Sequence, residues 1–174
     1  MTEDLVVDVD TLGEQVREKY REVAVTQEMV RVTRSGGRIV MGNWIPGDPT
    51  LVAQILKISG AYAPPPPEGF ISPVTWGVEA NVVERFTGAG VPEDRISFAR
   101  DTYHFIDPAP PSELLAAFRT YYGPTMNAFE AAEGRGRTAD LQNELEALFN
   151  SQNASSNNNT TSIPATFLRA TVAV

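Results

Sequence analysis

A helix-to-strand transition near the start of the chain limits the possible folds more than any other feature. Residues 28–44 read EMVRVTRSGGRIVMGNW: a helix end rich in Met and Val, a Ser-Gly-Gly turn, and a short apolar strand at 38–41 that opens onto Gly42-Asn43-Trp44. This pattern is typical of a late strand in a doubly wound α/β domain, where ligands bind beyond the carboxyl ends of the strands. Because the strand ends before residue 45, the usual early half, which holds the cofactor site, is not expected here.

Length and composition predict one globular domain over residues 1–174, with an N-terminal leader and helix at 1–27 and the α/β part at 28–174. The formal net charge of −8 disfavours nucleic acid as a partner. The absence of cysteine excludes disulfides and thiolate chemistry. No apolar run approaches the roughly 20 residues that span a bilayer, and the acidic start shows no secretory signal. We therefore expect a soluble, cytoplasmic protein without membrane contact.

The first 25 residues do not provide a nucleotide-binding loop. Apolar residues at helical spacing predict a helix over 11–25, and the preceding run Leu5–Asp10 could form a short strand. A strand followed by a helix suggests a phosphate-binding loop, but such a loop needs several glycines and only Gly13 is present. An acidic leader followed by one amphipathic helix is the preferred interpretation.

In the rest of the chain, predicted helices and strands follow one another, separated by breaks that contain proline or glycine. The tetraproline at 64–67 predicts a stiff, extended connector. The Asn/Ser/Thr-rich stretch at 150–162 predicts a flexible surface loop. Helices are predicted at 49–61, 75–86, 112–122, 125–133 and 138–150, and strands at 95–106 and 165–174.

Few residues suggest catalytic chemistry. His104 is the only histidine, and its place in an apolar strand favours a packing or hydrogen-bonding role over that of a general base, although Asp101 and Asp107 are close to it in the sequence. No spacing suggests a metal site. The aromatic residues form either part of the core or the apolar wall of a substrate pocket; they include Trp44, Trp76, Tyr103, Phe118, Tyr121 and Tyr122.

From residue 28 onward, the chain resembles the C-terminal half of a class I S-adenosylmethionine-dependent methyltransferase of the ubiquinone/menaquinone type. The resemblance rests on SGGRIVMGNW, SPVTWG, FRTYYGPTMNAF and the closing TFLRATVAV. It implies a partial doubly wound, Rossmann-like sheet of three or four strands with flanking helices, closed by an antiparallel strand. It also implies a small, apolar methyl acceptor, whose pocket would use Asn43, Trp44, Trp76, Tyr103, Phe118, Tyr121 and Tyr122.

The chain departs from this family in its cofactor motifs. The glycine-rich loop and the acidic residue that bind S-adenosylmethionine in the family are absent, so no cofactor-binding residue is assigned and we expect the chain alone to bind no cofactor. The resemblance then implies a truncated methyltransferase, inactive alone; the alternative is a non-enzymatic binding or interaction domain. The strand at 38–41 would lack a neighbour, which predicts a homodimer or a complementing N-terminal half unless Leu5–Val9 covers the edge.

Overall fold

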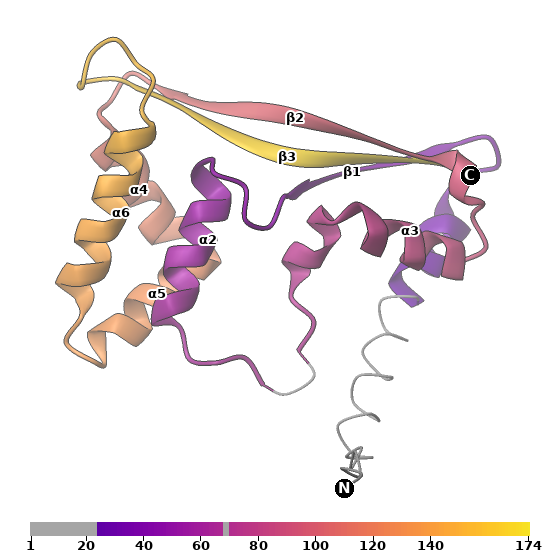
Figure 1. The fold of residues 1–174 in the computed structure, drawn as a ribbon, viewed down its shortest axis with the longest axis horizontal. Helices are drawn as coiled ribbons and strands as arrows, with labels where there is room; N and C mark the ends of the chain where they lie inside the picture. Colours follow the sequence, from indigo (N-terminus) through magenta and orange to yellow (C-terminus); the bar gives the residue numbers. More distant parts are fainter. Residues whose placement is uncertain (1–23, 68–69) are drawn as a thin grey trace, which may run out of the picture.

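The computed structural model describes residues 24–67 and 70–174, which form a mixed α/β structure (Figure 1). Residues 24–32 are helical. The elements that follow are β1 (Arg38–Trp44), α2 (Leu51–Tyr62), the 3₁₀ helix η1 (Pro73–Gly77), α3 (Glu79–Gly88), the 3₁₀ helix η2 (Glu93–Arg95), β2 (Ile96–Asp107), α4 (Pro111–Tyr121), α5 (Gly123–Glu133), α6 (Thr138–Gln152) and β3 (Thr161–Ala173).

The three strands form one sheet in the order β1-β3-β2. The closing strand β3 pairs antiparallel with both neighbours, as predicted, so β1 and β2 run in the same direction on either side of it. The helices α2 and α3 lie in the connection between these two parallel strands. A doubly wound sheet of adjacent parallel strands is not found in the described residues, because every pairing there is antiparallel.

Each face of the sheet is buried at only one end of β3, and the two faces are buried at different ends. Side chains alternate between faces along a strand, and β3 buries Ile163 and Ala165 near its start but Ala170 and Val172 near its end. These two pairs have opposite parity, so the buried face changes between residues 165 and 168. We call the face with Ile163 and Ala165 the cap face, and the face with Ala170 and Val172 the α3 face.

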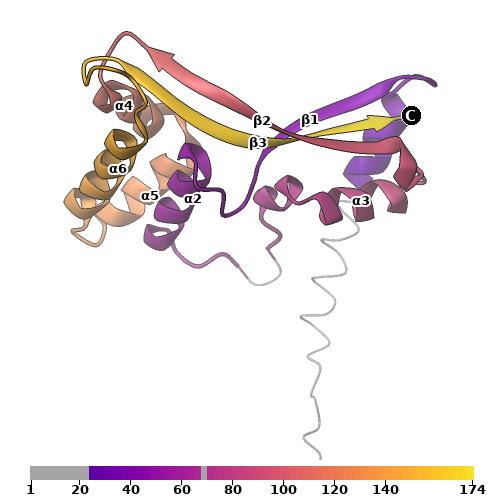
Figure 2. The same cartoon turned by 45° about the horizontal axis from the view of Figure 1, so that its top comes forward.

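Each buried face has its own hydrophobic cluster. On the cap face, the helices α2, α4, α5 and α6 form a cap whose core includes Leu51, Leu145 and Phe149. On the α3 face, Val82 and Phe86 of α3 pack with Ala170 and Val172. The long, twisted sheet spans both ends, and both helical groups lie below it in the views shown (Figures 1 and 2). The right-handed twist of the long strands rotates the sheet between its two ends, so the cap face at one end and the α3 face at the other point in the same direction.

Most predicted elements are present, with corrections at their ends. The strand expected at 38–41 continues through Asn43 and Trp44, because pairing with β3 extends to Phe167. The helix expected at 75–86 is divided into η1 and α3. The last strand begins at residue 161, within the stretch expected to be a flexible loop, and α6 extends to residue 152. Most of the helix predicted at 11–25, and the run Leu5–Asp10, lie outside the described residues.

The short connection between α6 and β3 is closed by hydrogen bonds from one asparagine. The Asn153 carbonyl Oδ1 accepts from the backbone N–H of Ser155 and of Ser162, and its Nδ2 donates to the backbone carbonyl of Thr160. Asparagine commonly satisfies turn backbone in this way. The polar composition of the segment therefore serves a tight connection between a helix and a strand.

Candidate aromatic groove

An open apolar groove lies on the cap face of the sheet, at the edge of the helical cap. It has a volume of about 430 Å³ and is lined by Gly42, Trp44, Tyr103, Phe105 and Phe167. All three strands contribute: Gly42 and Trp44 lie on β1, Tyr103 and Phe105 on β2, and Phe167 on β3. Trp44 is in register with Phe167. The helical cap covers β3 only as far as Ala165, so the same face is left open from Phe167 onward.

Because Gly42 has no side chain, the ring of Phe167 can lie close to the backbone of β1. A Cβ atom at Gly42 would lie 3.3 Å from two atoms of the Phe167 ring, which is a tight contact. The Phe167 ring also meets Trp44 edge to face, with 6.1 Å between the ring centroids. These contacts fix the β1 side of the groove.

On the β2 side, the groove continues into the core of the cap through a series of rings. Tyr103 contacts Phe105 with 4.9 Å between centroids, and Phe105 contacts Phe118 of α4 at 5.5 Å. Phe118 in turn packs edge to face against Tyr122 and Phe149. Tyr103 itself is 54% exposed, so its ring is accessible to a ligand. Edge-to-face pairs of this kind stabilise packing beyond simple burial.

Polar groups are few around the groove. Asp101 and Arg169 share the cap face with it, and the Arg169 Nε donates to the Asp101 carboxylate at 2.6 Å. Burial raises the pKa of the Tyr122 phenol, so that hydroxyl stays protonated at neutral pH. Aromatic walls with sparse polar groups suit a flat, apolar ligand. The Tyr103 hydroxyl and the Trp44 indole N–H are the polar side-chain groups among the lining residues.

The structure brings some of the sequence-predicted site residues together and separates others. Trp44 and Tyr103 line the groove, and Phe118 and Tyr122 connect it to the cap core. Asn43 alternates with Trp44 and therefore faces the opposite side of the sheet. Trp76 packs under the guanidinium of Arg85 in the α3 cluster, and Tyr121 is 83% exposed on α4.

Sequence reasoning missed three groove residues, Gly42, Phe105 and Phe167. Phe105 follows Tyr103 at the spacing that places two side chains on one face of a strand, so the sequence contained this signal. It contained no signal for the register that brings Phe167 beside Trp44, because that register depends on pairing across more than a hundred residues. Gly42 acts only through the space it leaves for Phe167.

His104 and the Gly36-Gly37 turn are the other residues that the sequence singled out. His104 is exposed on β2, and it lies on the face opposite to Asp101 and Asp107, so neither carboxylate can orient it from within its strand. The Gly36-Gly37 turn joins the end of the chain: the Gly36 N–H donates to the Val174 carbonyl, and the Val174 N–H donates to the Gly37 carbonyl. Within residues 24–67 and 70–174, no three acidic or histidine side chains are grouped to hold a metal ion.

Comparison with known proteins gives distant relatives. Over 143 residues the chain is 28% identical to uncharacterized proteins of Mycobacterium bovis and of two strains of Mycobacterium tuberculosis. The match covers 80% of this chain and 49% of each relative, so the chain spans about half the length of these curated relatives. No family model matches the sequence. Among the helices of the described residues, none combines the length and apolarity required to cross a membrane.

Proposed function

We propose that residues 28–174 form the acceptor-side half of a class I S-adenosylmethionine-dependent methyltransferase, with the aromatic groove holding a small apolar acceptor. The position of the groove supports this most strongly. Trp44 ends β1, and Tyr103 and Phe105 lie in the carboxyl half of β2, which runs parallel to β1. In α/β folds, ligands bind near the carboxyl ends of parallel strands. The antiparallel strand between β1 and β2 agrees with the resemblance found in the sequence.

In this proposal the cofactor is bound elsewhere than in the described residues. The groove offers aromatic stacking, but its lining residues include neither an acidic acceptor for the ribose hydroxyls nor a cluster of donors for the methionine carboxylate. The outer edge of β1 has no strand partner within residues 24–67 and 70–174, and a cofactor-binding half would supply one. When bound, S-adenosylmethionine would provide the methyl group, and this chain would hold and orient the acceptor. A cytoplasmic location stays a prediction.

Acceptor binding can be tested with 2-naphthol as a flat, apolar probe. Trp44 supplies the fluorescence signal once the second tryptophan is removed by Trp76→Phe. In that background, Tyr103→Ala should weaken probe binding about fivefold, because one aromatic contact contributes about 1 kcal/mol. Tyr121→Ala is the matched control, since it removes an exposed tyrosine outside the groove. Equal losses in both variants would refute the assignment of the groove.

The role of the cofactor needs a separate measurement. Calorimetric titration with S-adenosylmethionine should show no binding to this chain alone, and micromolar binding would contradict the proposal. Adding the part of a mycobacterial relative outside the matched region should then permit transfer of a labelled methyl group to an acceptor. If the groove binds the probe and no such mixture transfers a methyl group, the alternative, a non-enzymatic binding domain, is supported.

A further inference from the structure

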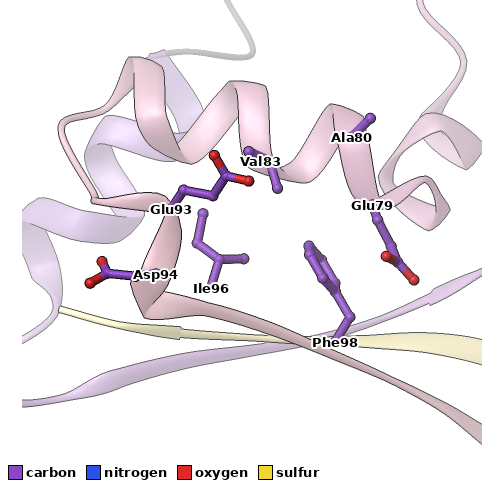
Figure 3. A pocket seen from close by; sticks show the side chains of 7 residues that line it. All are labelled: Glu79, Ala80, Val83, Glu93, Asp94, Ile96 and Phe98. Carbon is purple, nitrogen blue, oxygen red and sulfur yellow. The ribbon is translucent and has the colours of Figure 1, made fainter.

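A second hollow, of about 750 Å³, lies between α3 and β2, on the α3 face of the sheet and away from the aromatic groove. Figure 3 shows Val83 of α3 and Ile96 and Phe98 of β2 pointing into the space between the two elements. All three side chains are half-buried, so they form an apolar floor that is still open to a ligand.

Carboxylates stand at both ends of this floor. Glu79 lies at one end and Glu93 at the other, while Asp94 points away from the apolar residues (Figure 3). Glu79 and Glu93 are exposed, and neither forms an ion pair with any part of the chain that the structure describes. An apolar floor between two uncompensated carboxylates matches an apolar ligand with positive charges at its ends.

The outer edge of β2 runs along the same hollow. This strand of 12 residues pairs only with β3 within residues 24–67 and 70–174, so its other side presents unpaired backbone groups. An extended segment added at this edge would alternate its side chains between the two faces. Every second side chain would therefore lie over Val83, Ile96 and Phe98.

We propose that the outer edge of β2 and the hollow beside it bind an extended segment of a partner protein, with apolar residues flanked by Lys or Arg. Backbone pairing with β2 gives the segment its direction, and Glu79 and Glu93 select its basic ends. A second copy of this chain is a poorer occupant, because each copy has a net charge of −8. This interface is separate from the aromatic groove and does not depend on methyl transfer.

A synthetic peptide, acetyl-Lys-Thr-Val-Thr-Val-Thr-Lys-amide, is a suitable probe, because its Lys and Val side chains fall on one face of a strand. We expect the full chain to bind it, with affinity that falls as salt is raised. The same peptide with Glu in place of Lys should bind at least tenfold more weakly. A peptide N-methylated at both its valines and its threonines should lose binding, because neither of its edges can then donate hydrogen bonds to β2. Equal binding of the acidic or the methylated peptide would overturn the proposal.

Variants of the protein separate this site from the general acidity of the chain. The double substitution Glu79→Gln and Glu93→Gln should weaken peptide binding about fivefold, which is the loss expected when two exposed ion pairs are removed. The control pair Glu113→Gln and Glu133→Gln changes the charge equally on α4 and α5, and Glu113, like Glu79, lies in the first turn of a helix. Equal losses in the two double variants would refute the site. So would dissociation of a dimer by the peptide in sedimentation, because a second copy of this chain would then occupy the edge of β2.

Discussion

A single methyl group at Gly77 should destabilise the protein more than most surface changes, because the backbone of β1 lies directly against this position. Gly77 ends η1 and is buried. A Cβ atom there would lie 2.0 Å from the Trp44 carbonyl oxygen and 2.8 Å from its carbonyl carbon. These are backbone atoms and cannot rotate away. The two segments must separate by at least 1.0 Å to restore the 3.0 Å below which Cβ contacts essentially never occur.

This separation is expected to lower the free energy of unfolding in Gly77→Ala by about 2–3 kcal/mol, the usual cost of overpacking. For a protein of this size, Tm should fall by about 5–10 °C. Urea titration followed by circular dichroism measures the free energy. Tryptophan fluorescence checks the location, since Trp44 and Trp76 flank the clash. Because the clash displaces Trp44, probe binding in the aromatic groove should weaken as well.

The same substitution at Gly60 provides the control. Gly60 lies in α2 and is exposed, and a Cβ atom added there would have no neighbouring atom within 4 Å. Alanine is favoured over glycine within a helix by about 0.5–1 kcal/mol, so Gly60→Ala should be slightly stabilising. If Gly77→Ala were as stable as the original protein, or if both substitutions lowered stability equally, the contact between η1 and β1 would not have the proposed role.

Further predictions concern the cap and its connections. Phe149→Ala should lower the free energy of unfolding by about 3–5 kcal/mol, because Phe149 is 1% exposed, whereas Phe70→Ala, at a side chain 53% exposed, should change it little; urea titration compares them. The Tyr62 hydroxyl donates to the Glu144 carboxylate, which raises the pKa of the phenol. This contribution is complete below pH of about 10 and is lost as pH rises through the folded-state pKa, so thermal melts of Tyr62→Phe should show a smaller decline above pH 10. Asn153→Ala should lower Tm, since three backbone groups lose their partner, whereas Asn158→Ala should not.

Local sequence signals identified the elements but not their pairing. Helical spacing and proline or glycine boundaries predicted the helices of the cap to within a few residues. The start of β3 was missed because Thr161 and Ser162 resemble the polar loop before them. Their strand conformation depends on pairing with Asp107 and Ile106, which no local pattern indicates. The division between η1 and α3 was missed for a similar reason, since the break follows the contact of Gly77 with β1.

Aromatic character predicted two groove residues, Trp44 and Tyr103, which lie on different strands. Alternation along β2 would have added Phe105 to Tyr103. Trp76 and Trp44 both looked like pocket residues, yet the structure places Trp76 with Arg85 and Phe86 in the α3 cluster. Composition cannot separate these two tryptophans, because the separation depends on which face of the sheet each one meets.

The change of buried face along β3 explains why an open aromatic groove exists at all. A sheet covered on one face along its whole length would bury Phe167, since Ile163 and Ala165 on the same face have no exposed surface. Here the cap ends at Ala165, and the next buried residue of β3, Leu168, lies on the other face. Phe167 is therefore the first cap-face residue of β3 without a helix above it. Trp44 lies opposite it on β1, and Tyr103, opposite Ala165 on β2, lines the other side of the groove. Because these rings stay partly exposed after folding, a ligand that covers them would gain the burial energy of the area that folding leaves exposed.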